Sequence, residues 1–144
     1  MKNRSPIRIL VVEDDDRHAK LISRCLDRET LASSVERVEN GAQALEYLHK
    51  EGRYQTADRP DLVLLDLEMP AMNGIDVLRH VKADPELASI PVVMLSTSDD
   101  PMDRQLAYAL HVNSYLVKPP DLLLMERLVR DLLSYWSVWN RPPS

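Results

Sequence analysis

Short apolar runs alternate with amphipathic stretches along the whole chain. The apolar runs have the length of buried strands, and the amphipathic stretches repeat their apolar positions at helical spacing. This alternation is typical of repeated β-α units around a parallel sheet. It predicts strands at residues 7–12, 35–38, 61–66, 92–95 and 114–117. It predicts helices at 17–28, 42–50, 75–83 and 101–110, and a last helix from 121 to 136 or a little beyond.

Capping and proline positions agree with this segmentation. Asp15 or Asp16 can cap the first predicted helix, and Pro101 stands in the first turn of the fourth. None of the ten prolines falls in a predicted central strand or beyond the first turn of a predicted helix, where proline is poorly tolerated. Residues 52–60 lack any pattern and predict a polar loop of unusual length.

The composition is that of one globular domain, with 144 residues, 44% hydrophobic and 28% charged. We expect residues 1–144 to form a single domain that ends in the last helix and a short tail, with no output domain. A net charge of −5 without a Lys/Arg-rich run argues against nucleic-acid binding. No apolar stretch approaches the ~18 residues of a membrane span, and no signal-peptide pattern opens the chain, so we expect a cytoplasmic protein. The single cysteine, Cys25, is expected to be a core residue.

Polar side chains follow four of the predicted strands. Because the carboxyl ends of parallel strands lie on one edge of a sheet, these groups should lie near one another. They are Glu13 and Asp14 after the first strand, Asp66 at the end of the third, Ser96 after the fourth and Lys118 after the fifth.

Three carboxylates at one edge need a cationic partner, since each close pair repels by about 4 kcal/mol at an effective dielectric of ~20 and ~4 Å. Oxygen ligands without a His or Cys cluster favour Mg²⁺. Lys118 adds a point charge suited to a phosphoryl oxygen, and the Ser96 hydroxyl could bond another. The pattern therefore indicates a carboxylate nucleophile, Asp66, that accepts a phosphoryl group.

With these motifs the chain resembles the receiver domains of two-component response regulators over nearly its whole length. The resemblance implies a flavodoxin-like, doubly wound, five-stranded parallel sheet of order 2-1-3-4-5, with helices on both faces. Glu13 stands where Asp is commoner and Ser96 where Thr is commoner, and both keep the required functional group. The motifs are Glu13-Asp14, residues 66–70 with Gly74, Ser96-Thr97 and Lys118-Pro119.

The same resemblance implies a role for each site residue. Asp66 is the phospho-acceptor, and Lys118 binds the phosphoryl group. Glu13, Asp14, Asp66 and the backbone carbonyl of Glu68 are implied to hold Mg²⁺.

A switch and a lifetime control are implied in the same way. Ser96 moves toward the phosphoryl group and lets the ring of Tyr115 turn inward, while Glu68 and Ser98 tune the phosphate lifetime. Tyr115 also has a simpler interpretation, as an aromatic residue half buried at a sheet edge. Lys118-Pro119 is implied to be a cis peptide, which only X-Pro bonds adopt readily.

A narrower likeness concerns residues 52–60, 96–101 and 113–119 and the aromatic tail. These are similar to small stand-alone regulators that serve bacterial phytochromes and related histidine kinases. The implied partner is a histidine kinase, with a bacterial phytochrome as one candidate.

The last predicted helix carries more apolar residues than one stripe against a sheet requires. One interpretation is a deeply buried helix. The preferred one is a homodimer built on this helix, with Trp136 and Trp139 as aromatic anchors.

The expected function is a stand-alone response regulator that takes phosphate from a kinase phosphohistidine and loses it slowly by hydrolysis, without being an enzyme otherwise. Two alternatives remain: a phosphatase or phosphotransferase using Glu68 as acid/base, and a non-phosphorylated interaction module.

The four histidines lie on different predicted elements and predict no metal site. His18 is interpreted as a surface residue that could touch a partner.

Overall fold

Five parallel strands form the centre of the molecule in the computed structural model, which describes residues 7–27 and 32–143. Their order across the sheet is β2-β1-β3-β4-β5, as predicted for a doubly wound fold. All neighbouring pairs are parallel. The strands are β1 (Ile7–Val12), β2 (Ala32–Val38), β3 (Leu62–Leu65), β4 (Val92–Ser96) and β5 (Ser114–Val117).

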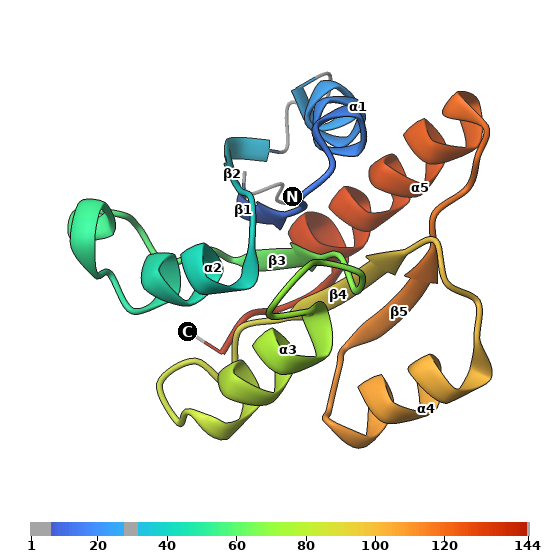
Figure 1. Cartoon of the computed structure of the whole chain (residues 1–144). Helices are drawn as coiled ribbons and strands as arrows, with labels where there is room; N and C mark the ends of the chain where they lie inside the picture. Colours follow the sequence, from blue (N-terminus) through green and yellow to red (C-terminus); the bar gives the residue numbers. More distant parts are fainter. Residues whose placement is uncertain (1–6, 28–31, 144) are drawn as a thin grey trace.

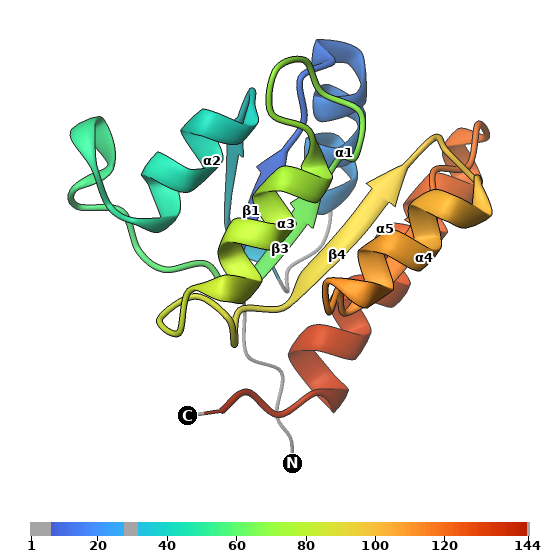
Figure 2. The same ribbon diagram turned by 60° about the horizontal axis from the view of Figure 1, so that its bottom comes forward.

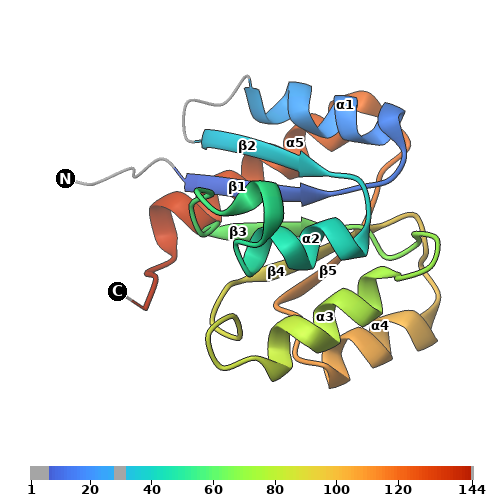
Figure 3. The same cartoon turned by 60° about the vertical axis from the view of Figure 1, so that its left-hand side comes forward.

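Helices cover both faces of this sheet (Figure 1). Two of them, α1 and α5, lie side by side on one face, and the other three cover the opposite face. Figure 3 shows the strands pointing in one direction between the two helical layers. The helices are α1 (Asp16–Asp27), α2 (Gly41–Leu48), α3 (Gly74–Ala83), α4 (Pro101–Ala109) and α5 (Leu122–Ser134).

The alternation of side chains along each strand divides the interior into two cores. Along β1, Leu10 and Val12 face the layer of α2, α3 and α4, while Ile9 and Val11 face α1 and α5. Cys25 lies in the second core and is buried, as predicted. The central strands β3 and β4 are buried along their whole length, which explains their unbroken apolar sequence.

Side-chain caps start the helices, and the cap of α1 is one of the two residues that the sequence suggested. Asp15 accepts the backbone N–H groups of Arg17 and His18 at the start of α1. Asn40, Asp100 and Asp121 accept backbone N–H groups in the first turns of α2, α4 and α5. These caps fix where the loops after the strands turn back into helices.

Most element boundaries lie within two residues of the predicted ones, and the larger differences concern β2, the end of α5 and the loop over residues 52–60. β2 is seven residues long and begins at Ala32, earlier than predicted. α5 ends at Ser134 and continues as a π-helical segment, Tyr135–Trp139. The loop over residues 52–60 contains a short 3₁₀ helix, Gly52–Tyr54. The predicted last residue of the first helix, Arg28, lies outside the described residues.

Two further observations concern the described residues only. They contain no cis peptide bond, so the prediction of a cis Lys118-Pro119 bond is wrong, and the bond has the trans form that X-Pro bonds favour. None of their helices combines the length and apolar content needed to cross a bilayer.

Candidate functional site

The carboxyl ends of the neighbouring strands β1 and β3 hold a pair of buried acids. Glu13 follows β1, and its backbone N–H donates to the carbonyl of Val38 at 3.1 Å. Asp66 follows β3, and its N–H donates to the carbonyl of Val12 at 3.0 Å. Sheet-like hydrogen bonding thus extends one residue past each strand and fixes both backbones.

Asp14 completes a cluster with these two acids. Carboxylate oxygens of Glu13, Asp14 and Asp66 all lie within 4.8 Å of one another. Glu13 and Asp66 are buried, while Asp14 is exposed to solvent. An all-oxygen, negatively charged donor set with one open side fits a hard divalent cation that keeps several water ligands, as Mg²⁺ does.

Lys118 brings the compensating charge from β5. Its ammonium nitrogen lies 2.5 Å from Glu13 Oε1 and 3.5 Å from Asp66 Oδ1. The side chain is buried, and its backbone N–H donates to the carbonyl of Ser96 at 2.7 Å, which ties it to the end of β4. The structure therefore brings together four residues that the sequence predicted at one sheet edge.

The Asp66 carboxyl has an unusual proton affinity. Burial raises the pKa of Asp66 to about 7, and the negative charges of Glu13 and Asp14 add to the rise. Lys118 opposes the shift but does not cancel it. The site thus carries more negative charge than Lys118 compensates, which is the electrostatic condition that favours a bound cation.

The loop after Asp66 folds tightly back over the acid. The N–H of Gly74 donates to the carbonyl of Leu67 at 2.8 Å, and a Cβ atom at Gly74 would lie 2.3 Å from the Asp66 carbonyl oxygen. Asn73 and Asp76 form a capping box that starts α3 at this point. Only glycine allows α3 to begin this close to the backbone of Asp66.

Ser96 is fully buried at the end of β4 and connects to the neighbouring loop. Its hydroxyl accepts the N–H of Ser98 at 3.0 Å. The Ser98 carbonyl in turn accepts the hydroxyl of Tyr115 at 2.8 Å, and the Ser98 hydroxyl donates to Asp103 of α4 at 2.5 Å. The Tyr115 ring is buried rather than half buried. Through Ser98, these hydrogen bonds link Ser96 with both β5 and α4.

Glu68 lies outside this buried network. Its side chain is exposed and accepts the hydroxyl of Thr97 at 3.3 Å. An acid/base role of the phosphatase type would require a carboxylate held toward Asp66, and this contact holds Glu68 toward Thr97 instead. The role of its backbone carbonyl as a metal ligand stays a prediction.

Two residues of the site escaped the sequence analysis. His18 Nδ1 lies 3.0 Å from Lys118 Nζ, a contact that the interpretation of His18 as a surface residue did not include, although its side chain is 38% exposed. Arg37 of β2 donates from Nε to the Glu13 carbonyl and from Nη1 to Asp16, both at 2.9 Å. The available signal for His18 was its position four residues after Asp14, because helical side chains lean toward the N-terminus.

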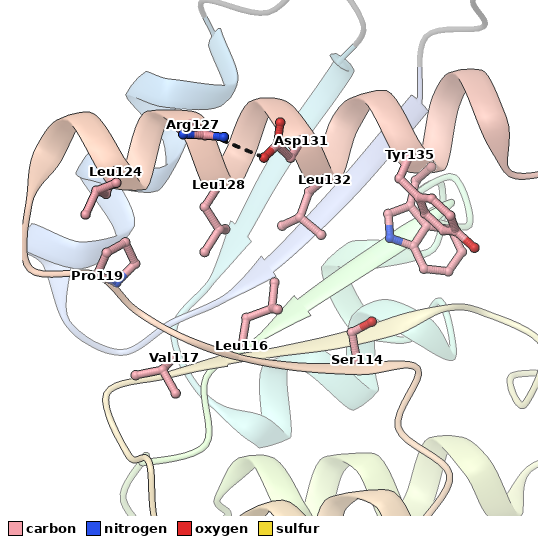
Figure 4. A pocket seen from close by; sticks show the side chains of 11 residues that line it. Ser114, Leu116, Val117, Pro119, Leu124, Arg127, Leu128, Asp131, Leu132 and Tyr135 are labelled. Carbon is pink, nitrogen blue, oxygen red and sulfur yellow. Dashed lines mark ion pairs between the residues drawn. The ribbon is translucent and has the colours of Figure 1, made fainter.

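A second feature is the apolar outer surface of α5. The interpretation of α5 as a deeply buried helix is wrong, because one stripe packs inward while several large side chains face solvent. Leu128 and Leu132 line an open groove of about 570 Å³ between α5 and β5, with Tyr135 at one end (Figure 4). Trp136 also lines this groove. The exposed residues are Leu122, Leu123, Leu124, Tyr135 and Trp139.

Comparisons with a family model and with known proteins point to the same family. Residues 9–130 match the model of the response regulator receiver domain. The probable methanogenesis regulatory protein FilR2 of Methanothrix harundinacea is 42% identical over 139 residues, or 96% of this chain and 88% of that protein. The response regulator Rcp1 of Synechocystis is 37% identical over 128 residues, covering 89% of this chain and 87% of Rcp1.

Solved structures agree with these relatives. The phosphorylated cyanobacterial phytochrome response regulator RcpA matches with a TM-score of 0.92 and 39% identity, covering 97% of this chain and 100% of RcpA. The Mn²⁺-bound form of Rcp1 matches with a TM-score of 0.89 and 35% identity, covering 96% of this chain and 100% of Rcp1.

Proposed function

The chain belongs to the response regulator receiver domain family, and from this premise we propose that it accepts a phosphoryl group on Asp66 from the phosphohistidine of a partner kinase. The observation that carries the proposal is the cluster of Glu13, Asp14 and Asp66 beside Lys118. A buried carboxylate flanked by a lysine and an oxygen-lined cation site has the parts that phosphoryl acceptance needs.

In the proposed reaction an Asp66 carboxylate oxygen forms a bond to phosphorus while the donor's nitrogen–phosphorus bond breaks and its electron pair returns to the imidazole. Lys118 lies 3.5 Å from Asp66 Oδ1 and is positioned to bind an oxygen of the arriving group. The Ser96 hydroxyl can bond another oxygen. Glu13, Asp14, Asp66 and the Glu68 carbonyl would hold Mg²⁺, which when bound neutralises charge on the transferring oxygens.

The proposed signal leaves the site through the loop that follows β4. A shift of Ser96 toward a phosphoryl oxygen would strain its hydrogen bond to Ser98, and Ser98 is bonded to both Tyr115 and Asp103. Tyr115 and α4 would therefore respond together, as a two-state surface requires. Hydrolysis resets the state slowly, and we propose that Glu68 and Ser98 tune its rate.

The proposed partners are proteins. The similarity to RcpA, a cyanobacterial phytochrome response regulator, supports a phytochrome-type histidine kinase as the phosphoryl donor. Phosphohistidine formed from ATP would place the exchange in the cytoplasm, and the net charge of −5 speaks against nucleic acid as the target. The exposed apolar residues of α5 and Trp139 support a homodimer through this helix.

Acetyl phosphate with Mg²⁺ tests the central proposal without knowledge of the kinase. We expect intact-mass spectrometry to record one added phosphoryl group on the wild type and none on Asp66→Asn. Beryllofluoride, which mimics the phosphoryl group, should change the spectroscopic signals of the wild type only when Mg²⁺ is present. No adduct, or an adduct that persists in Asp66→Asn, would contradict the proposal and favour a non-phosphorylated module.

A matched assay addresses the enzyme alternative. Turnover of small phosphate esters by the wild type, with loss of turnover in Glu68→Gln, would favour a phosphatase. We expect no turnover, because the Glu68 carboxylate is exposed and bonded to Thr97.

A further inference from the structure

The ammonium group of Lys118 has three neighbours at the site. Glu13 Oε1 lies at 2.5 Å, His18 Nδ1 at 3.0 Å and Asp66 Oδ1 at 3.5 Å. A lysine ammonium has three N–H donors and no acceptor. The two shorter contacts, with Glu13 and His18, thus occupy two of the N–H donors of Lys118 and leave the third for Asp66.

His18 reaches this position from the first turn of α1 and is only partly exposed. Because Lys118 can only donate, the Nδ1 atom of His18 must accept, and the ring proton is on Nε2. The backbone of His18 is fixed as well, since its N–H donates to the Asp15 cap at 3.3 Å. His18 is therefore a neutral acceptor on a rigid helix start.

We propose that His18 is a positioning residue for phosphoryl transfer, which holds Lys118 so that its free N–H is directed at the acceptor oxygen of Asp66. This inference rests on the proposed function. Glu13 cannot position Lys118 alone, because its carboxylate also belongs to the cation site. The His18 imidazole lies farther from that site, with Nδ1 at 3.9 Å from Glu13 Oε1, and keeps its bond to Lys118 when Glu13 carries a second partner.

The first test compares phosphorylation rates with acetyl phosphate at saturating Mg²⁺. His18→Leu removes the acceptor, whereas His18→Asn offers a side-chain oxygen close to where Nδ1 stood. His80→Leu on α3 is the control, because His80 is an exposed histidine whose Nδ1 lies 2.9 Å from the backbone carbonyl oxygen of Asp76 on the same helix.

We expect His18→Leu to react roughly three- to tenfold more slowly, which corresponds to the loss of one hydrogen bond to a charged group. His18→Asn should recover to within about twofold of the wild type, and His80→Leu should match it. Mg²⁺ affinity should stay unchanged in all three variants. A wild-type rate in His18→Leu, or an equally slow His18→Asn, would overturn the proposal.

A double-mutant cycle separates positioning of Lys118 from a general structural effect. In a Lys118→Met background the bond partner of His18 is gone, so His18→Leu should cause no further loss of rate. An equal loss in both backgrounds would contradict the proposed role.

The contact can also be measured without any phosphorylation. Nitrogen NMR of the His18 ring should give an unprotonated Nδ1 whose resonance shifts in Lys118→Met. An unchanged resonance would overturn the inference, even in a protein that accepts phosphate. If the wild type accepts no phosphoryl group, the proposed function fails, and the shift of this resonance still decides whether His18 holds Lys118.

Discussion

Asp66 is a carboxyl group whose neutral form the fold favours. The side chain is buried, and burial raises its pKa to about 7 while Glu13 and Asp14 add to the rise. In the absence of a cation, ionisation of Asp66 therefore destabilises the folded state. The same crowding of charge makes the residue suited to a cation and to phosphoryl transfer.

This cost predicts a pH dependence of stability in metal-free buffer. Between about pH 4 and pH 7 the folded state keeps a proton on Asp66 that the unfolded chain has released, since the ordinary pKa is 3.8. The contribution of Asp66 to the free energy of unfolding should thus fall as the pH rises through this window and stay low above it. Asp66→Asn resembles the protonated form and should lack this fall.

Denaturant unfolding with a chelator present measures the effect. At about pH 8, Asp66→Asn should be more stable than the wild type by about 1 to 3 kcal/mol, and near pH 4 the two should agree. Addition of Mg²⁺ at the higher pH should narrow the gap, because the cation stabilises the ionised acid. A variant less stable than the wild type at both pH values would contradict the prediction.

At this scale, sequence reasoning located the residues whose position depends on the backbone alone. Glu13, Asp66 and Lys118 follow strand ends, and a parallel sheet brings such positions together whatever the side chains do. His18 and Arg37 depend on the direction of long side chains across neighbouring elements. The spacing of His18 from Asp14 places it near the acids but does not reveal that its ring contacts Lys118, and no spacing signals the contacts of Arg37, so both were missed.

At the scale of elements, the junction between β3 and α3 depends on Gly74. A Cβ atom there would lie 2.3 Å from the Asp66 carbonyl oxygen and 2.8 Å from Leu67 Cα, both rigid backbone atoms. Gly74→Ala should therefore destabilise the protein by about 3 kcal/mol or more and displace Asp66, slowing phosphorylation.

Gly52→Ala is the matched control for this change. Gly52 has a φ of +57° and only a flexible carboxylate near its Cβ position, at 3.4 Å. Its substitution should cost about 1 kcal/mol through backbone conformation alone and leave phosphorylation intact. Equal losses of stability and activity in the two variants, measured by thermal unfolding and acetyl phosphate labelling, would refute the crowding argument.

The loop between β1 and α1 is held to the sheet by Arg37. The guanidinium donates to the carbonyl of Glu13 and to Asp16, which lie on either side of Asp14 in the sequence. Arg37→Met should weaken Mg²⁺ binding roughly three- to tenfold by releasing this loop. Titration calorimetry provides the measurement.

Charge alone would act in the opposite direction, because removing a cation from an acidic site strengthens cation binding. Arg17→Met is the control, since Arg17 is an exposed arginine of α1 that contacts Asp15 at 3.5 Å but does not hold the loop to β2. Mg²⁺ binding in Arg37→Met as tight as in Arg17→Met would rule out the anchoring role.

Element boundaries were predictable where local chemistry defines them. β5 has the predicted residues, and Pro101 begins α4 after the Asp100 cap. β2 was predicted too short, because its early residues Ala32-Ser33-Ser34 have no strand signature; Ala32 and Ser34 pair with Ile7 and Arg8 across a register shift. The last helical stretch ends at Trp139, within the predicted end at Trp136 or a little beyond, but the π-helical form of Tyr135–Trp139 was not predicted. Ser137 is buried there and donates to the carbonyl of Leu133, a contact that composition does not reveal.

At the scale of the whole molecule, the proposed site extends from the ends of β1 and β3 to Ser96 of β4 and Lys118 after β5, and the exposed apolar side chains lie on α4, α5 and the segment after α5. Figure 2 shows α4 and α5 both on the side of β4. The hydrogen bonds of Ser98 connect Ser96 to Tyr115 and to α4, so they join the acid site to that side of the molecule. A change of charge at Asp66 can thus bias a surface for protein contact.

Self-association through α5 should depend on the apolar side chains that the fold leaves uncovered. Leu123 is 74% exposed and Trp139 73%, whereas Trp136 is partly buried against the core and contacts Tyr135 edge to face. Of the two tryptophans, Trp139 is therefore the one that is exposed enough to serve as an interface anchor.

We expect the wild type to sediment as a dimer at tens of micromolar, and Leu123→Gln and Trp139→Gln each to weaken dimerisation by about five- to thirtyfold, as loss of an interface anchor does. Met102→Gln is the control, because Met102 of α4 is equally exposed at 75% but lies on a different helix. A wild type that stays monomeric with and without beryllofluoride would exclude the dimer. A Met102→Gln variant that dissociates while Leu123→Gln does not would move the interface to α4, since exposure alone cannot distinguish the two helices.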